Sequence, residues 1–399
     1  MKVINKIAFL VHEPTMYTHY ASVWTEMEKD TFVIVLLGVF SKNSHDEHGT
    51  KEFVKKVTNQ GYEITYLNDL VANKVKFQYV VSNHILGGSS RYPTLRYKVY
   101  LNKVKNIIKC SLNFFHRNIY SKNKYQVNHF DSTQYIPLQA GITQIRFMYG
   151  ADISDAWSLD EWNEIYDLFL CHGPNDEMHL RERFKGKTAQ MGYPRYDGYF
   201  NPDLNIDDVV SEFDIDLTKK TILWMPTYDV LGDYICSIIP FSAVLSNLTP
   251  DFNIIVRPHP LSFRHDPTAI ETLKSFGYKV DRDSTRDMNK LFKLADFVFC
   301  DYGGSAFGAL YLGKKMVFLS NPDFGKSLMA KGSSNLELRK YFPSVTVEEA
   351  GTLSVLLKNT SFWDETLNQS KLLSNKFFAD YRGTSSLEAS KILSKFTAI

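Results

Sequence analysis

Short runs of β-branched and aromatic residues alternate with segments of helical periodicity along the whole chain. The first set of apolar runs covers residues 6–11, 31–37, 77–81, 142–148 and 166–171, and the second covers 221–225, 252–256, 296–300 and 315–319. Alternating strands and helices are typical of α/β folds, and continuously apolar runs are typical of strands buried on both faces of a parallel sheet. We therefore predict an α/β protein with two parallel sheets.

A polar stretch, residues 201–220, separates the two sets of strands and begins with the turn signal Asn-Pro-Asp. It predicts an N-terminal domain over residues 1–204 and a C-terminal domain over 205–382. The last segment, 383–399, has the pattern of a helix that starts behind a serine cap and crosses back to the N-terminal domain. Its expected apolar face is formed by Leu387, Ile392 and Phe396.

The composition favours a globular protein with two domains. The chain has 399 residues, of which 44% are apolar, and this is enough to bury two cores. Its four cysteines lack metal-ligand spacing, which favours a reduced, cytoplasmic protein without structural zinc or disulfides. No apolar run near the N-terminus has the length of a signal peptide, and none anywhere approaches the roughly 18 residues of a membrane span.

Charge is nearly balanced, at a formal net +2, but it is unevenly distributed. Residues 70–130 carry eleven Lys or Arg and no Asp or Glu, whereas the rest of the chain has 35 basic and 44 acidic residues. Within this basic segment, residues 97–115 have the periodicity of a helix with one apolar and one basic face. The basic face, a predicted membrane or polymer surface, contains Lys98, Lys105 and Lys109. The alternative is an ordinary docked helix with a solvated basic face. No nucleic-acid-binding motif accompanies the charge, so a nucleic-acid partner is not expected.

The most site-like feature is Asp301-Tyr302-Gly303-Gly304-Ser305, which follows the predicted strand 296–300. Ligands of open α/β sheets bind at the carboxyl ends of the strands, and glycines before a helix let backbone N–H groups approach an anion. This turn is therefore a candidate phosphate site. The alternative is an ordinary strand-to-helix turn, in which Ser305 only caps the helix.

Further motifs follow other predicted strands. In Arg257-Pro258-His259-Pro260 the prolines restrict the backbone, the arginine suits a phosphate, and the histidine can donate a hydrogen bond or move a proton. A rigid loop with an exposed histidine is the alternative. Thr227 is a candidate ligand contact, and Arg195, within Gly-Tyr-Pro-Arg-Tyr-Asp, is expected beside the cleft. The triplet Asp281-Arg282-Asp283 is common by chance, and no metal site is predicted from it.

The ordered set Gly-Tyr-Pro-Arg-x-Asp, Pro-Thr, Arg-Pro-His-Pro and Asp-Tyr-x-x-Ser resembles the CDP-glycerol glycerophosphotransferases of teichoic acid and capsule synthesis. The resemblance implies two Rossmann-like domains that face a cleft, the GT-B arrangement, and a metal-independent transferase at the cytoplasmic face of the membrane. It implies that His259 acts at the donor phosphate. The donor-binding residues that follow from the motifs are Arg257, Thr227, Asp301, Tyr302, Gly303, Gly304, Ser305 and Arg195.

One position departs from the family pattern. The family carries an earlier His-Gly-Thr, whose histidine is proposed as the base on the acceptor hydroxyl, and Met148-Tyr149-Gly150-Ala151 stands at the expected place. A phenol is a poor base near neutral pH, so another group is expected to assist or replace it. The predicted catalytic residues are His259, Tyr149 and Asp152, and the further acceptor-side candidates are His12, His19 and Asp155.

These expectations combine into one function. The protein is expected to move a polyol phosphate, such as glycerol phosphate, from a CDP-activated donor to a hydroxyl of a cell-surface glycan or polymer precursor, releasing CMP and using no cofactor. The C-terminal domain would bind the donor and the N-terminal domain the acceptor. A lipid-linked acceptor and contact with the anionic inner membrane face are expected from the basic segment. The alternatives are a GT-B glycosyltransferase that uses a nucleotide sugar, a sugar-nucleotide 2-epimerase, and a non-catalytic module that binds an anionic glycan or a membrane.

Overall fold

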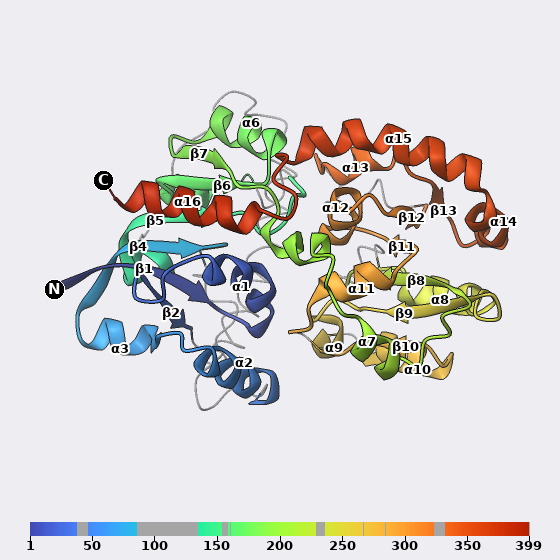
Figure 1. The fold of residues 1–399 in the computed structure, drawn as a ribbon, viewed down its shortest axis with the longest axis horizontal. Helices are drawn as coiled ribbons and strands as arrows, with labels where there is room; N and C mark the ends of the chain where they lie inside the picture. Colours follow the sequence, from blue (N-terminus) through green and yellow to red (C-terminus); the bar gives the residue numbers. More distant parts are fainter. Residues whose placement is uncertain are drawn as a thin grey trace, which may run out of the picture.

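The computed structural model describes residues 1–37, 47–85, 135–153, 159, 161–228, 236–265, 267–283, 285–322 and 332–398. These residues form two halves, each built on a parallel sheet that helices cover on both faces (Figure 1). All described strand pairs are parallel, so the predicted α/β class with two parallel sheets is confirmed.

The N-terminal sheet has seven strands in the order β3-β2-β1-β4-β5-β6-β7. They are β1 (Lys2–Val11), β2 (Phe32–Leu36), β3 (Ile64–Tyr66), β4 (Val75–Ser82), β5 (Gly141–Phe147), β6 (Leu168–Cys171) and β7 (Lys187–Gln190). The helices of this half are η1 (Pro14–Met16), α1 (Tyr17–Thr25), α2 (Glu47–Asn59), α3 (Leu67–Ala72), α5 (Ile136–Ala140), η5 (Glu161–Ile165), α6 (Pro174–Arg183) and η6 (Pro194–Phe200). Along β1, Phe9 and Val11 pack into the core on one face of the sheet, while Ala8 and Leu10 pack into the core on the other. The apolar run thus reflects burial on both faces.

The C-terminal sheet has six strands in the order β10-β9-β8-β11-β12-β13. They are β8 (Lys220–Met225), β9 (Phe252–Val256), β10 (Lys279–Val280), β11 (Phe297–Cys300), β12 (Lys315–Leu319) and β13 (Ser344–Val345). The helices are α7 (Asp207–Glu212), α8 (Ile238–Ser246), α9 (Ser262–His265), α10 (Pro267–Ser275), α11 (Met288–Leu294), α12 (Gly304–Tyr311), α13 (Asn335–Leu338), η8 (Ala350–Thr352), α14 (Leu353–Lys358) and α15 (Thr360–Phe377). Trp224 and Leu223 of β8 enter the cores on opposite faces. Because β8, β9 and β11 are parallel, the connections that follow them leave the same edge of the sheet.

The nine predicted strands are all present, and four strands were not predicted: β3, β7, β10 and β13. These four are the edge strands of the two sheets. An edge strand pairs on one side only, and these four are two to four residues long, so they lack the continuous apolar run from which the central strands were predicted.

The last helix, α16 (Ser385–Thr397), returns to the N-terminal half, over which it lies in red in Figure 1. Ala389 and Leu393 pack into the N-terminal core. The predicted apolar face was partly wrong, because Leu387 is 38% exposed and lies outside the buried stripe that Ala389 and Leu393 define. The serine cap was also wrong, because the carboxylate of Asp197 accepts hydrogen bonds from the Ser385 N–H (3.1 Å) and the Ser386 N–H (2.6 Å). The Asp of the Gly-Tyr-Pro-Arg-Tyr-Asp motif thus caps this helix.

Candidate functional site

The turn between β11 and α12 has the geometry of an anion cradle. Gly303 has φ +92° and ψ −158°, a backbone conformation that is in practice restricted to glycine. A Cβ atom built at Gly303 or at Gly304 would meet no atom within 4 Å, so the space in front of both residues is open. In the described part of the chain the Ser305 hydroxyl is partly exposed and has no hydrogen-bond partner. Free N–H groups and the positive end of the α12 dipole therefore face open space, as an anion site requires.

Asp301, directly before this turn, is buried, with 1% of its surface exposed. Its carboxylate accepts hydrogen bonds from the Thr227 N–H (2.8 Å), the Ser237 N–H (2.7 Å) and the Ser237 hydroxyl (2.8 Å). Burial raises the pKa of Asp301 to about 6, although these hydrogen bonds act in the opposite direction. A carboxylate would repel a diphosphate, and here it instead holds the loop after β8 and the start of α8 against the turn. Asp301 therefore positions the loops around the turn.

Arg257 follows β9, and its guanidinium is held by Asp281, a residue for which no role was predicted. Its Nη1 donates to the carboxylate of Asp281 and to the backbone carbonyl of Asp283. The other oxygen of Asp281 accepts a hydrogen bond from Arg286 Nε at 2.9 Å, and the Asp281 side chain is fully buried. The first acid of the Asp-Arg-Asp triplet thus orients Arg257. Within the described residues no protein partner holds Nη2 of Arg257, which stays available to a phosphate oxygen.

His259 has a defined tautomer in this structure. Its Nδ1 accepts a hydrogen bond from the Leu261 N–H at 3.2 Å, so the proton of the neutral ring is on Nε2. The ring of Tyr228 lies beside it, with the centroids 4.7 Å apart. Burial lowers the pKa of His259 to about 4, partly opposed by the negative charge of Glu13 in the N-terminal half. The histidine is therefore neutral at physiological pH and presents an N–H donor.

Asp152, predicted as catalytic, joins the two halves. It is 3% exposed, and its Oδ1 accepts hydrogen bonds from the Ser333 hydroxyl (2.8 Å) and the Asn335 N–H (3.2 Å), both in the C-terminal half. Tyr302, predicted to bind the donor, is buried beside the same carboxylate and is hydrogen-bonded to it. Burial raises the pKa of Asp152 to about 6. This arrangement favours a structural role for both residues, because neither side chain has the exposure that substrate contact requires.

On the N-terminal side, the structure brings together His19, Tyr149 and Arg195. The rings of His19 and Tyr149 meet edge to face, with centroids 5.5 Å apart, and Nη1 of Arg195 lies 3.4 Å from His19 Nε2. Burial and then the charge of Arg195 lower the pKa of His19 well below its ordinary value. Because Arg195 can only donate, the His19 Nε2 lone pair points at the guanidinium. Arg195, predicted as a donor-binding residue, belongs to η6, and its side chain lies against α1 of the N-terminal half.

His12 and Glu13 follow β1 at the same edge of the N-terminal sheet. His12 Nε2 lies 3.6 Å from Glu13 Oε1, and His12 Nδ1 is buried without a hydrogen-bond partner. Glu13 is the group of the N-terminal half whose charge acts on His259. His12 was predicted as an acceptor-side residue and Glu13 was not, although Glu13 also comes directly after an apolar strand, where ligand contacts are expected.

Four predicted residues lie outside the described part of the chain: Asp155, Lys98, Lys105 and Lys109. Besides Glu13 and Asp281, the prediction missed two residues that support the Asp301 turn. Ser237 donates to its carboxylate, and Arg339 donates to its backbone carbonyl. These contacts join segments that are far apart in the sequence, and no local pattern marks them.

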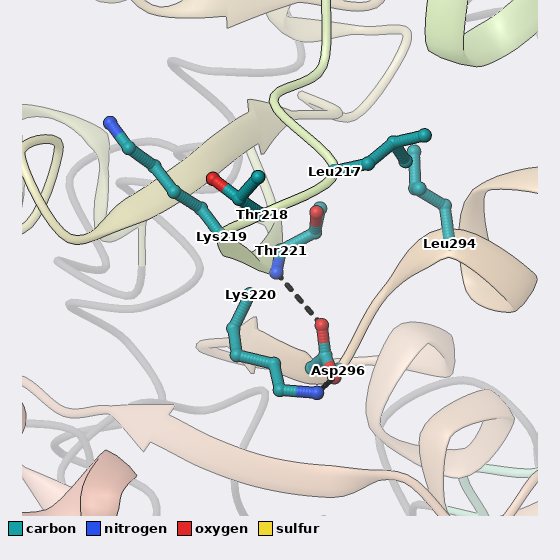
Figure 2. A pocket seen from close by; sticks show the side chains of 7 residues that line it. All are labelled: Leu217, Thr218, Lys219, Lys220, Thr221, Leu294 and Asp296. Atoms are coloured by element: carbon teal, nitrogen blue, oxygen red, sulfur yellow. Dashed lines mark hydrogen bonds and ion pairs between the residues drawn. The ribbon is translucent and has the colours of Figure 1, made fainter.

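Figure 2 shows a cavity of about 180 Å³ on the C-terminal half. Its lining residues are Leu217, Thr218, Lys219, Lys220, Thr221, Leu294 and Asp296. Asp296 accepts a hydrogen bond from the Thr221 N–H (2.9 Å) and pairs with Lys220 (2.8 Å). These residues stand at the amino ends of β8 and β11, whereas the turn at Gly303 follows the carboxyl end of β11. The cavity is therefore separate from the predicted donor site.

Neither a metal site nor a membrane-spanning helix is found among the described residues. They contain no group of three His, Cys, Asp or Glu side chains that could hold a metal ion. Nor does any helix in the described ranges combine the length and the apolar character needed to cross a bilayer.

The whole chain is similar in fold to solved structures of the wall teichoic acid polymerase TagF. A histidine-to-alanine variant of TagF matches with a TM-score of 0.60 and 13% identity, covering 99% of this chain and 90% of that chain. Anabaena HepE in complex with UDP and glucose matches with a TM-score of 0.52 and 10% identity, covering 99% and 100%. S. aureus MnaA with UDP matches with a TM-score of 0.51 and 11% identity, covering 100% and 97%. The likeness confirms the predicted GT-B arrangement.

A search of curated proteins found no match. The family model described as CDP-glycerol:poly(glycerophosphate) glycerophosphotransferase matches residues 55–388 of the chain. This range contains every motif that carried the sequence resemblance, from Arg195 to Ser305. The chain therefore belongs to the CDP-glycerol:poly(glycerophosphate) glycerophosphotransferase family.

Proposed function

We propose that this protein transfers glycerol phosphate from CDP-glycerol to a terminal hydroxyl of a phosphate-containing polymer, with release of CMP. Family membership supports the donor and the reaction class. The observation that carries the proposal for this chain is the group formed by the open Gly303 turn, Arg257 and His259. Arg257 and His259 follow the carboxyl end of β9, and the Gly303 turn follows that of β11; the two strands flank β8, so all three groups lie at one edge of the sheet, where they can bind one diphosphate together.

In the proposed reaction the acceptor oxygen forms a bond to the β-phosphorus of the donor, and the bond from that phosphorus to the bridging oxygen breaks. The bridging oxygen leaves with CMP. Backbone N–H groups at the start of α12 and the Nη2 of Arg257 stabilise the negative charge on the diphosphate. Neutral His259 donates a hydrogen bond from Nε2 to a phosphoryl oxygen. A phosphate leaving group is stable as an anion, so a neutral donor is sufficient.

The acceptor hydroxyl must also lose a proton. Tyr149 is a phenol, and the lone pair of His19 Nε2 faces Arg195. His12 and Glu13 are the remaining acceptor-side pair among the described residues, and the charge of Glu13 reaches His259. We therefore assign proton acceptance to the His12–Glu13 pair. Neither this assignment nor the donor contacts requires a metal, and independence from metals stays a prediction.

The proposal is tested with purified protein, CDP-glycerol and a synthetic glycerol phosphate trimer as acceptor. We expect His259→Gln to lower kcat at least tenfold while CDP still stabilises the protein against heat. His179→Gln on α6 is the matched control. Unchanged turnover in His259→Gln would remove this histidine from the mechanism.

A second candidate function is glycosyl transfer from a nucleotide sugar. It is favoured by Tyr149, which replaces the histidine expected in a glycerophosphotransferase. The products distinguish the two reactions. A phosphodiester together with CMP supports glycerophosphate transfer, whereas a glycoside together with a nucleoside diphosphate supports glycosyl transfer.

We further propose that the acceptor is lipid-linked and that the basic segment holds the protein at the inner face of the cell membrane, where it contacts anionic lipid. The support is the charge of residues 70–130, because each Lys or Arg near an anionic surface contributes about 1 kcal/mol. Flotation with phosphatidylglycerol vesicles tests it. Replacing Lys98, Lys105 and Lys109 by Gln should reduce binding, and full retention would contradict the proposal.

A further inference from the structure

Arg195 is a partly buried cation for which the described residues supply no acid. Its Nη1 and Nη2 lie 3.4 Å from His19 Nε2 and Thr18 Oγ1, the guanidinium stands over the Tyr196 ring at 5.3 Å, and its Nε is buried without a hydrogen-bond partner. In the described ranges no carboxylate lies within ion-pair distance of this guanidinium. A partly buried charge without a counter-charge is unfavourable, so the position favours an anionic ligand.

Two other arginines at the carboxyl edge of a sheet, Arg257 and Arg286, are each balanced by acids. Arg257 and Arg286 share the buried carboxylate of Asp281, and Arg286 also pairs with Glu212 at 2.6 Å. The contrast with Arg195 is informative, because Arg195 is also partly buried and also lies at the carboxyl edge of a parallel sheet.

The position of Arg195 indicates which substrate it faces. Its backbone carbonyl accepts a hydrogen bond from Asn289 of the C-terminal half at 3.1 Å, while its side chain lies against α1 of the N-terminal half. Its charge acts on His19, whereas the charge that acts on His259 comes from Glu13. We therefore assign the guanidinium, which lies against α1, to the acceptor side.

We propose that Arg195, positioned by the Thr18 hydroxyl, binds a phosphate group of the acceptor that lies one repeating unit behind the attacking hydroxyl. This inference rests on the proposed function and specifies its acceptor. In a glycerol phosphate chain, one three-carbon unit separates the terminal hydroxyl from the preceding phosphate. The proposal thus assigns the hydroxyl to the donor site and the phosphate behind it to Arg195. The planar guanidinium suits such a contact, because it donates two parallel hydrogen bonds.

The test compares two synthetic acceptors in a CMP-release assay with CDP-glycerol: a glycerol phosphate trimer and an uncharged glycerol glycoside. For Arg195→Gln we expect kcat/KM with the trimer to fall about 10- to 100-fold, mainly through KM, as the loss of a charge-assisted contact implies. The uncharged acceptor and the Kd of CDP-glycerol should change less than about twofold. Arg195→Lys should be intermediate. Arg181→Gln is the matched control, since Arg181 is an exposed arginine on α6 that pairs with Glu177.

Three results would overturn the inference: an equal loss with both acceptors, weaker binding of CDP-glycerol, or a wild-type level of activity with the trimer. Thermal unfolding of Arg195→Gln and Arg195→Lys identifies a loss that comes from misfolding. If the wild-type protein transfers nothing from CDP-glycerol, the proposed function fails, and the anion site is tested separately by calorimetric titration with the trimer. Binding to the wild type that is lost in Arg195→Gln supports the site, and no binding to the wild type refutes it.

Discussion

Replacing Asp152 with Asn distinguishes a catalytic carboxylate from one that joins the two halves. The hydrogen bonds from Ser333 and from the Asn335 N–H both end on Oδ1, and an amide oxygen can accept both. The contact with Tyr302 can also persist, because the amide N–H can donate to the hydroxyl oxygen. The pKa of Asp152 rises from its ordinary value of 3.8 to about 6 because the carboxylate is buried. The substitution therefore removes a buried charge and keeps the contacts.

The sign of the effect follows from proton linkage. The folded state binds the Asp152 proton more tightly than the unfolded state, so the wild-type protein loses stability as the pH rises from about 4 to about 6. At about 1.4 kcal/mol per tenfold change in proton affinity, the loss is on the order of 3 kcal/mol. Asp152→Asn has no proton to release, so it should be more stable than the wild type by up to about 3 kcal/mol near neutral pH and similar to it below about pH 4.

Calorimetry of both proteins at about pH 4.5 and about pH 7.5 measures this difference in stability. For a folding unit of this size, a difference of 1 kcal/mol shifts Tm by roughly 2–4 °C. Asp152→Ala, which leaves the Ser333 and Asn335 donors unpaired, should instead be less stable by about 1–3 kcal/mol. CMP release from CDP-glycerol is measured in parallel and should be unchanged in Asp152→Asn. A variant that is as stable as the wild type but does not turn over would refute this reasoning and restore Asp152 as a catalytic residue.

Other predictions concern the donor side. Asp281→Asn removes the charge that compensates Arg257, so we expect the free energy of unfolding in urea to fall by about 3–5 kcal/mol and CDP-glycerol to bind more weakly. Asp283→Asn, at an exposed side chain, is the control and should change neither quantity. Gly303→Ala should cost about 1–3 kcal/mol of stability because alanine would be strained in this backbone conformation, which is in practice restricted to glycine. Gly304→Ala should leave the Tm unchanged yet weaken CDP-glycerol binding, since its methyl group would occupy the open space of the cradle; tight binding in that variant would place the diphosphate elsewhere.

The central part of both sheets could be predicted from the sequence, because strands such as β9 and β11 are buried on both faces and must be apolar throughout. The edge strands β3, β7, β10 and β13 could not, because their stability comes from pairing with a neighbour rather than from their own composition. The candidate motifs were found for a similar reason. Parallel strands align their carboxyl ends at one edge of the sheet, so a polar motif after an apolar run is already located in space.

The partners of the motif residues could not be predicted in the same way. Nothing in the local sequence of Arg257 indicates that Asp281 holds it. Nor does the sequence around Arg195 indicate that it has a histidine and a threonine beside it and, in the part of the chain that the structure describes, no acid. Asp152 and Tyr302 looked like substrate contacts until the structure showed them buried against each other. Burial and pairing of such groups depend on how segments far apart in the chain pack together.

The sequence by itself determined the two parallel sheets, the glycine turn before α12 and the restrained His259, because these follow from apolar periodicity and from the backbone preferences of Gly and Pro. Only the tertiary structure decided the role of each charged group. It buried Asp301 as the support of both ends of the connection from β8 to α8, joined the halves through Asp152, and left Arg195 without a counter-charge among the described residues. The physical reason is that the free energy of a charge depends on its solvent exposure and on its neighbours in space, and neither quantity is local in sequence.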